Sequence, residues 1–415
     1  MIRGTKLNNK KNMSLTKKIM EYKTPNFLYF PLYCYKDNLY TELNIGDYVY
    51  KGDVLASNPN NIYTVPIHSS VSGYIVDIKN CVYIDNSIKK TIIIENDFRD
   101  KERKKTGITK KLNSFSKSEF VGLLKNAGIT GYSGNGFPTY LKYNVDLNIK
   151  TLIINMCESD SYLSCDYANL HDKTQEILET IDAIMDIFKI DECFIAVKNF
   201  NESTLEDLTD YAGSYPTIHI TEVPDIYPIG YERNLVKFIK KVNYVNVPLE
   251  KGIVVENIST IYAIYRLLKF KKPVTSRVVT VSGEGIKKPC NILVKEGTLV
   301  KDIINKVGGY KKTKENYNLI LGGPMSGNSI STDEVMITKS VTGIIVIKNK
   351  KEMTRDCINC GKCSNICPAN LSPFLILKNK KINTKKCIGC GLCSYICPSK
   401  IDLVNKIKEN NKGVK

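Results

Sequence analysis

The hydrophobic and polar positions between residues 150 and 270 follow two alternating patterns. Short apolar runs at 150–156 (KTLIINM) and 193–198 (CFIAVK) are typical of buried strands. Residues 170–188 instead place Ile and Phe on one face at helical spacing. Strand-like runs at 217–223 and 252–257, and helix-like segments at 203–208, 232–241 and 258–270, continue the alternation. The pattern predicts a doubly wound α/β domain, which we bound at residues 106–272.

Two β-rich regions flank this domain. Residues 43–78 contain short β-like segments in the order GDxVxKGDxL and then SxVSGxI, which resembles the small β-sandwich domains of biotinyl and lipoyl carriers. Those carriers need a lysine at a hairpin tip, where this chain has His-Ser-Ser at 68–70. We therefore interpret residues 25–98 as a structural β-sandwich, a barrel-sandwich hybrid. Residues 274–307 read as a hairpin and a short helix, which predicts a β-grasp unit with connecting strands over 273–348.

The strongest chemical signal is a duplicated cysteine motif near the C-terminus. CINCGKCSNICP is followed by CIGCGLCSYICP, and both read C-x2-C-x2-C-x3-C-P. Each cysteine of the second motif lies 30 residues after its counterpart, which indicates an internal duplication. The cysteines are Cys357, Cys360, Cys363 and Cys367 in the first motif and Cys387, Cys390, Cys393 and Cys397 in the second.

This spacing suits two [4Fe–4S] clusters. Three closely spaced thiolates hold three corners of one cluster, and the fourth cysteine of each run ligates the other cluster. A tetrahedral zinc site does not call for eight cysteines in a duplicated pattern. We therefore predict a two-cluster ferredoxin-like domain at 350–405. One cluster would take Cys357, Cys360, Cys363 and Cys397, and the other would take Cys387, Cys390, Cys393 and Cys367.

The net charge of the chain is +18. Base composition of the gene is one explanation, because Lys, Asn and Ile are abundant; attraction to acidic proteins or anionic lipid is the other. Residues 351–400 contain nine Lys and Arg but two acids, which favours an acidic electron carrier of the ferredoxin or flavodoxin type as partner. The basic stretches lack interleaved aromatic residues, so we expect no nucleic-acid partner.

The sequence also bears on location. No apolar run approaches the roughly 18 residues of a membrane span, and the basic N-terminus lacks the apolar core of a secretory signal. The six cysteines outside the motifs form no disulfide-like framework, which suits a reducing compartment. We expect a cytoplasmic protein, either free or peripheral at the inner face of the cell membrane.

Polar residues follow three of the predicted strands. In a doubly wound sheet, ligands bind beyond the carboxyl ends of the strands. A glycine-rich loop, GITGYSGNGFPTYLKY at 128–143, precedes the first strand. Together these features predict a nucleotide or flavin pocket, with ordinary polar loops as the alternative. The residues are Asn155, Glu158 and Asp160 after the first strand, Tyr227, Gly230 and Glu232 after 217–223, and Asn257 and Thr260 after 252–257.

The order of these pieces over residues 25–405 resembles the C subunit of the Rnf electron-transport complex, which couples ferredoxin and NAD. It is also similar to the flavin-bearing NADH subunit of respiratory complex I. The matching stretches are VPIHSSVSGYI, GYSGNGFPTYLKY, INMCESDSYLSCD, YPIGYE, VVENISTIYAIYR, VVTVSGEGIKKPCN, LGGPMSG and the two cysteine motifs. The resemblance implies FMN and NAD(H) binding in addition to two [4Fe–4S] clusters.

The resemblance also implies roles for single residues. Gly131, Gly134 and Gly136 would approach the nucleotide, and Lys142 would pair with phosphate. The flavin or nicotinamide side would be lined by Asn155, Glu158 and Asp160, and the pocket completed by Tyr227, Gly230, Glu232, Asn257 and Thr260. Glycines permit close backbone approach, and a lysine offsets phosphate charge.

Three departures from the family pattern leave the function open. The family loop reads G-x-G-G-A-G-F-P-T, whereas Ser133 and Asn135 replace a glycine and an alanine here. The acidic motif E-C-E-P-Y reads E-S-D-S-Y at 158–162, and RGTKLNNKKNMS stands in place of an N-terminal G-I-H-P-P-H run. A side chain at position 135 stands where a cofactor expects bare backbone.

The first functional hypothesis is a peripheral subunit of an Rnf-type membrane complex. It would pass electrons between NAD(H)/FMN and ferredoxin-like or reductase partners through two [4Fe–4S] clusters, as a component of an oxidoreductase. The alternative is a soluble paralogue in a fermentative anaerobe that feeds a dedicated reductase, as the proline reductase-associated and cobalamin reductase relatives of the family do. A third class is an electron-transfer adaptor with clusters and no flavin.

Overall fold

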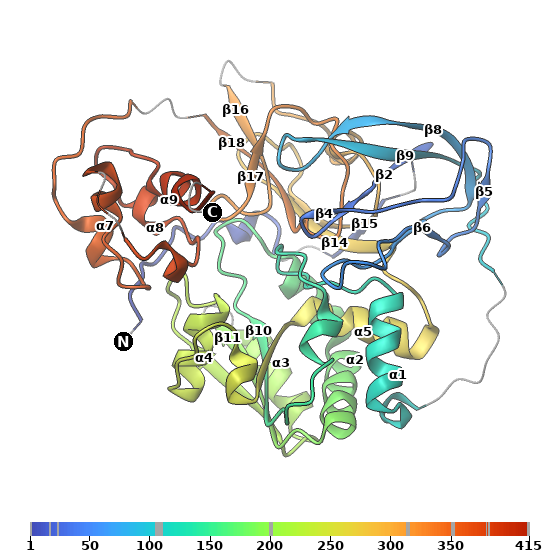
Figure 1. Cartoon of the computed structure of the whole chain (residues 1–415), viewed down its shortest axis with the longest axis horizontal. Coiled ribbons are helices and arrows are strands. Elements are labelled where there is room, and N and C mark those ends of the chain that lie inside the picture. The colour runs from blue at the N-terminus through green and yellow to red at the C-terminus, as the bar shows by residue number, and fades with distance from the viewer. Residues whose placement is uncertain are drawn as a thin grey trace.

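The computed structural model describes residues 2–15, 18–22, 25–103, 111–198, 202–312, 316–349, 353–378, 380 and 382–412. The predicted domain boundaries at residues 106 and 350 lie outside these ranges. Figure 1 shows the helices of the α/β domain below, two β-rich units above, and the cysteine-rich C-terminal unit at the left.

The α/β domain is built on a parallel four-stranded sheet in the order β12-β11-β10-β13. Both faces of the sheet are covered, so the predicted doubly wound fold is confirmed. Buried residues of α1 (Lys117–Asn126), α2 (Cys165–Phe188), α3 (Glu202–Ala212) and α5 (Ile258–Phe270) share one core, and those of α4 (Glu232–Lys240) belong to another. The strands are β10 (Thr151–Met156), β11 (Glu192–Lys198), β12 (Ile218–Val223) and β13 (Ile253–Asn257).

The strand order reverses between β10 and β13. The chain moves from β10 through β11 to β12 in one direction and then returns to β13 on the other side of β10. Asn155 of β10 and Asn257 of β13 are register partners at the carboxyl ends of these two strands. Ligands of doubly wound sheets bind at such a switch point, so the topology places the candidate site there.

The N-terminal β-sandwich contains a sheet in the order β2-β9-β8-β5 and two short strand pairs. His68, Ser69 and Ser70 are all buried, which agrees with a scaffold role for this unit. The sheet strands are β2 (Phe27–Pro31), β5 (Tyr48–Val49), β8 (Gly73–Val82) and β9 (Ile88–Asn96). The pairs are β3 (Tyr33–Cys34) with β4 (Asp37–Asn38), and β6 (Val54–Ala56) with β7 (Ile67–His68).

A six-stranded sheet in the order β1-β15-β14-β18-β16-β17 forms the second β-rich unit. The predicted hairpin is β14 (Ser276–Ser282) with β15 (Cys290–Lys295), and α6 (Val300–Lys306) is the predicted short helix. The N-terminal strand β1 (Met20–Glu21) adds to this sheet parallel to β15, although two residues are too few to show a periodicity in sequence. The remaining strands are β16 (Tyr317–Leu321), β17 (Asn328–Ile330) and β18 (Gly343–Lys348).

The C-terminal unit is a compact set of short helices around the cysteines. Each cysteine motif contains one helical turn, α7 (Lys362–Asn365) or α8 (Leu392–Tyr395), and α9 (Leu403–Lys412) closes the unit. Gly361 and Gly391 precede α7 and α8 with φ of +70° and +77°, a left-handed conformation that favours glycine. Short 3-10 helices lie at η1 (Lys11–Met13), η2 (Leu112–Ser114), η3 (Thr139–Lys142), η4 (Pro248–Lys251), η5 (Pro373–Lys378) and η6 (Thr384–Lys386).

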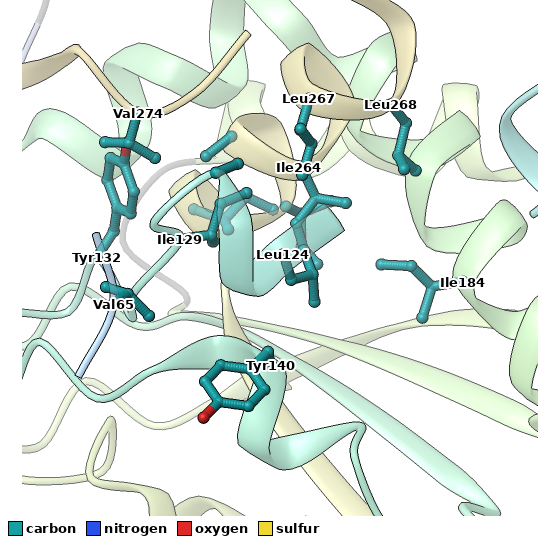
Figure 2. Packing of buried hydrophobic residues seen from close by; sticks show 14 of the residues in the cluster. Val65, Leu124, Ile129, Tyr132, Tyr140, Ile184, Ile264, Leu267, Leu268 and Val274 are labelled. Carbon is teal, nitrogen blue, oxygen red and sulfur yellow. The ribbon is translucent and has the colours of Figure 1, made fainter. Parts of the chain in front are cut away.

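The largest hydrophobic core anchors the glycine-rich loop. Leu124 of α1 and Ile264 of α5 lie close to Ile129, at the start of the loop, and all three are fully buried (Figure 2). Tyr132 and Tyr140 of the loop segment belong to the same core. Burying one such side chain contributes about 1.5–3 kcal/mol. The apolar residues of the loop therefore hold it in place between α1 and the sheet.

Candidate functional site

A cavity of about 550 Å³ lies at the switch point of the α/β sheet. Its volume is within the roughly 300–1,000 Å³ that small-molecule and cofactor sites occupy. Its wall combines the glycine-rich loop, the ends of β10 and β13, the 227–232 loop, the 321–328 loop and part of the second cysteine motif. Of the predicted pocket residues, those that line it are Gly131, Gly134, Lys142, Asn155, Glu158, Asp160, Tyr227, Gly230, Glu232 and Asn257.

The two other predicted residues lie beside the cavity. Gly136 borders a smaller hollow between the loop and the β-rich units. Thr260 is fully buried under the loop, where its hydroxyl accepts a hydrogen bond of 3.0 Å from the backbone N–H of Tyr132. Thr260 thus contacts the loop backbone and fixes its position.

The glycine-rich loop is a tight turn that is closed by a backbone hydrogen bond. Gly131 N–H donates to Phe137 O at 2.8 Å, and Gly134 and Gly136 have positive φ of +97° and +66°. Asn135 is exposed, and its Oδ1 accepts a hydrogen bond of 3.1 Å from the Phe137 N–H. The carboxamide oxygen of Asn135, the side chain that departs from the family pattern, is therefore bonded within its own loop.

Lys142 reaches from η3 over the end of β13. Its ammonium donates to Val255 O at 2.6 Å and lies 3.2 Å from Glu256 Oε2, whose side chain is fully buried. Burial raises the pKa of the Glu256 carboxyl, and the Lys142 charge opposes that rise. Sequence reasoning missed Glu256, although a carboxylate at the end of the apolar run GIVV was a usable signal.

The β10 end and the 227–232 loop are tied together. Asn155 Nδ2 donates to Gly230 O at 2.7 Å, and Gly230 N–H donates to Ser159 Oγ at 3.1 Å. A Cβ at Gly230 would lie 2.5 Å from Ser159 Oγ, so a larger residue cannot make this approach without a shift. Asn155, Gly230 and Ser159 thus form one side of the cavity as a unit.

Two carboxyl groups meet at the start of α2. Glu158 Oε1 accepts from the Asp166 N–H at 3.2 Å, and the Asp166 carboxylate accepts from Asn257 Nδ2 at 2.7 Å and Ser259 Oγ at 2.5 Å. Burial, and then the neighbouring charge of Glu158, raise the pKa of the Asp166 carboxyl to about 7. Asp166 lines the cavity but was not predicted, because its sequence context is an ordinary helix start.

Asp160 is held by the 321–328 loop of the second β-rich unit. Its carboxylate accepts from the Met325 N–H at 3.2 Å and from Ser326 Oγ at 3.0 Å. A Cβ at Gly323 would lie 2.0 Å from Asp160 Oδ2, so glycine is required for this contact. Burial raises the pKa of the Asp160 carboxyl. Asp160 therefore joins two units of the fold and still lines the cavity.

Tyr227 connects the cavity wall with the second cysteine motif. Its hydroxyl lies 2.5 Å from Cys390 O and 2.9 Å from the hydroxyl of Tyr231, another cavity residue. Ile388 and Gly389, between Cys387 and Cys390, line the cavity directly. Among the described residues, none from the first cysteine motif does so. The second motif is thus the one that borders the cavity.

The cysteines gather in the C-terminal unit as their spacing predicts. Burial raises the pKa of Cys387 and brings that of Cys390 to about 11, and in both cases the nearby Cys367 thiol adds to the rise. This proximity joins the fourth cysteine of the first motif to the second motif. In the described ranges, no three Cys, His, Asp or Glu side chains have the geometry of ligands to a single metal ion. Eight thiols in two motifs, with Cys367 beside the second motif, suit two [4Fe–4S] clusters instead, because each thiolate binds its own corner.

The cavity lining is rich in groups that can accept hydrogen bonds. Five carboxyl groups and one ammonium line it, and burial raises the pKa of Asp160, Asp166 and Glu256. Glu158 Oε2 and Glu256 Oε1 are buried and have no hydrogen-bond partner among the described residues. Such atoms call for donors from outside the protein.

Family models match four segments of the chain. They are the RnfC barrel sandwich hybrid domain at 1–99, the Nuo51 FMN-binding domain at 124–266, the SLBB domain at 278–329 and the 4Fe-4S dicluster domain at 356–401. These matches confirm the predicted multidomain α/β fold and the predicted cofactors, FMN and two [4Fe–4S] clusters. They do not favour the alternative of a soluble paralogue that feeds a dedicated reductase.

Two similar proteins and one solved structure agree with these family matches. The C subunit of the ion-translocating oxidoreductase complex of Rhodobacter capsulatus is 32% identical over 79% of this chain, which spans 64% of that relative's length. The C subunit of the proton-translocating ferredoxin:NAD(+) oxidoreductase complex of Clostridium ljungdahlii is 30% identical over 79% of this chain and 72% of the relative. An NAD+-reducing [NiFe]-hydrogenase structure in the air-oxidized state, 13% identical, has a TM-score of 0.50 over 71% of this chain and 61% of its own, and shares the fold.

The relatives are named as subunits of ion-translocating complexes. Among the helices in the described ranges, none is long and apolar enough to cross a membrane. The matched N-terminal model, the order of the domains and the two relatives agree with the resemblance found in the sequence. The chain belongs to the RnfC family, the C subunits of ion-translocating oxidoreductase complexes.

Proposed function

We propose that this protein passes electrons between NAD(H) and a ferredoxin-type partner, as a peripheral subunit of an ion-translocating membrane complex. The observation that carries the proposal is the shared wall of the cavity. Residues of the glycine-rich loop and residues 388–389 of the second cysteine motif line the same 550 Å³ space. A cofactor in that space would touch the loop between two cluster ligands, Cys387 and Cys390.

The chain's own residues would hold FMN by three kinds of contact. Gly131 and Gly134, which line the cavity, would let the cofactor approach the backbone, and Thr260 would support the loop from below. Lys142 would offset phosphate charge, exchanging its contact with Glu256 for one with the cofactor. Asn155, Tyr227, Gly230, Glu232 and Asn257 would shape the remaining wall. When bound, FMN supplies the exchange between two-electron nicotinamide chemistry and one-electron cluster chemistry.

Glu158 and Asp160 would face the nicotinamide side. Glu158 Oε2 is a buried acceptor with no hydrogen-bond partner among the described residues, and it suits a ligand hydroxyl or amide donor. Asp160 would help to position the loop that carries Glu158, since both of its own carboxylate oxygens already accept hydrogen bonds from the 321–328 loop. The C. ljungdahlii relative is named as a ferredoxin:NAD(+) oxidoreductase subunit, which favours NAD over NADP.

The first cysteine motif would face the electron-transfer partner. Cys360 is exposed, and Met353 and Ile358 beside it are 84% and 67% exposed. A unit with exposed apolar side chains and many exposed basic residues suits an acidic carrier, because opposite charges steer the encounter. Among the described residues, the exposed basic residues of this unit are Arg355, Lys362, Lys378, Lys380, Lys385, Lys386, Lys400, Lys406 and Lys408.

Anaerobic reduction by NADH tests the proposal. NADH added to the reconstituted protein should bleach the flavin absorbance and then reduce the clusters. In Glu158→Gln, the KM for NADH should rise about tenfold or more, because a charged acceptor is lost. Glu179→Gln, the same change at an exposed position of α2, is the control and should leave reduction unchanged. Flavin and clusters that stay oxidised under NADH would overturn the nicotinamide part of the proposal.

A further inference from the structure

Residues 2–15 form an N-terminal strap along the outside of the cavity wall. The strap begins beneath the C-terminal unit, in dark blue in Figure 1. Thr5 and Tyr227 exchange two backbone hydrogen bonds, from Thr5 N–H to Tyr227 O at 3.0 Å and from Tyr227 N–H to Thr5 O at 2.8 Å. Leu7 packs with Cys390 and Leu392 of the second cysteine motif. The strap therefore braces the loop that carries Tyr227.

Further along the strap, Lys11 is buried behind the loop at 157–164. The residue is 3% exposed, and its ammonium donates to Glu158 O and Asp160 O, at 2.8 Å each, and to Leu163 O. Lys10 N–H also donates to Ser161 O at 2.9 Å. Three donors of one ammonium meet three backbone acceptors of one loop.

The strap then reaches the second β-rich unit. The hydroxyl groups of Ser14 and Ser164 lie 2.7 Å apart, and Asn291 Nδ2 donates to Ser14 O at 3.2 Å and to Ser164 Oγ at 3.0 Å. All three side chains are buried. Later in the chain, β1 pairs with β15 in the same sheet that contains Asn291. The strap thus joins the 157–164 loop to a unit that lies far from it in the sequence.

The 157–164 loop has no helix or strand to order its backbone between β10 and α2. It nevertheless presents Glu158 and Asp160 to the cavity. We propose that the N-terminal strap holds this loop in its binding conformation and that Lys11 is the positioning residue. The expected effect on cofactor binding rests on the proposed function, whereas the contact between Lys11 and the loop does not.

A lysine suits this position better than an arginine. Three carbonyl groups that converge on one point match the compact ammonium, whereas the planar guanidinium presents its donors in a fork. Removing the ammonium would leave the three carbonyl oxygens, of Glu158, Asp160 and Leu163, without this donor. The loop would then exchange its ordered conformation for others in which water can solvate these groups.

The test compares Lys11→Met with Lys10→Met in the full-length, cluster-loaded protein. Both changes remove one lysine charge from neighbouring positions of the strap. Lys10 contacts the loop through its backbone N–H, which the substitution retains, and its side chain is only half-buried. The pair therefore separates the loss of the Lys11 ammonium contacts from the loss of a positive charge.

Three measurements follow from this comparison. Hydrogen–deuterium exchange of the peptide covering 157–164, without flavin, should be faster in Lys11→Met and unchanged in Lys10→Met. Iron content should stay near eight per chain in both variants, or about two four-iron clusters. The Kd for FMN, measured by quenching of flavin fluorescence, should rise about tenfold in Lys11→Met alone.

The outcomes test the strap inference and the proposed function separately. Unchanged exchange of 157–164 in Lys11→Met would overturn the strap inference, whatever FMN does. Faster exchange with an unaltered FMN Kd would overturn the link between the strap and binding. If the unmodified protein binds no FMN, the proposed function fails, while the exchange experiment still decides whether Lys11 positions the loop.

Discussion

The hydroxyl of Tyr227 lies 2.5 Å from the backbone carbonyl oxygen of Cys390. Tyr227 lines the cavity, and Cys390 is a predicted ligand of the second cluster, so one hydrogen bond joins the cavity wall to the second cysteine motif. The contact is buried, where a hydrogen bond is stronger and less screened than at the surface. It fixes the second cysteine motif against the wall of the α/β domain.

Replacing Tyr227 by Phe should shift the reduction potential of one cluster and slow electron transfer between flavin and cluster. The change removes the hydrogen bond to a ligand carbonyl, and hydrogen bonding around a cluster is one of the factors that set its potential. The loss in stability should be about 1 kcal/mol. A redox titration followed by electron paramagnetic resonance measures both clusters separately.

Tyr231→Phe is the matched control. Tyr231 also lines the cavity, but Tyr227 keeps its contact with Cys390 O when the Tyr231 hydroxyl is absent. The control should leave both cluster potentials near those of the unmodified protein. Equal shifts in the two variants would argue against a specific role for the Tyr227–Cys390 contact.

The crossed ligand sets predict different effects for Cys367→Ala and Cys397→Ala. Each change should lower the iron content from about eight to about four per chain. Cys367 lies near Cys387 and Cys390, so Cys367→Ala should remove the cluster beside the cavity. Flavin-to-cluster electron transfer should then be lost in Cys367→Ala and kept in Cys397→Ala. The opposite pattern would mean that each motif ligates its own cluster.

The Lys142–Glu256 pair predicts a double-variant result. Lys142→Met should weaken FMN binding by about tenfold or more, because a charge that can face phosphate is lost. It also leaves Glu256 buried without its cation. Lys142→Met/Glu256→Gln removes that second effect. FMN titration of both variants should show weak binding in each, whereas recovery in the double variant would assign the loss to Glu256 alone.

The Asp166 carboxyl predicts a pH dependence of stability. Its pKa is about 7 in the fold, against an ordinary value of 3.8. Between these values the folded state keeps a proton that the unfolded state has lost, so this group lowers stability as pH rises across the window. The thermal midpoint should therefore fall less from pH 5 to pH 8 in Asp166→Asn than in the unmodified protein. Parallel midpoints in both proteins would contradict the raised pKa.

Much of the fold could be predicted from the sequence because its signals are local. The apolar runs at 150–156 and 193–198 correspond to β10 and β11, and cysteine spacing marked the C-terminal unit. The glycine-rich loop lies at the cavity, and ten of the twelve predicted pocket residues line it. Local patterns identify strands, turns and the residues that follow strand ends.

The remaining features depend on contacts between distant segments. In the sequence, Lys11 is one of many lysines, and the residues around it do not indicate that it is buried against Glu158 O. The approach of residues 388–389 to the cavity and the addition of β1 to a distant sheet are likewise set by packing between domains. Glycine spacing alone also did not separate Gly136 from the two glycines that line the cavity.

The FMN content of the anaerobically reconstituted protein tests the central claim most directly. Acid extraction and chromatography should recover about one FMN per chain, together with about eight irons. That result would agree with a cavity in which the Asn135 carboxamide is bonded within its own loop. Full iron content with no extractable FMN would contradict the account and leave an electron carrier with clusters alone.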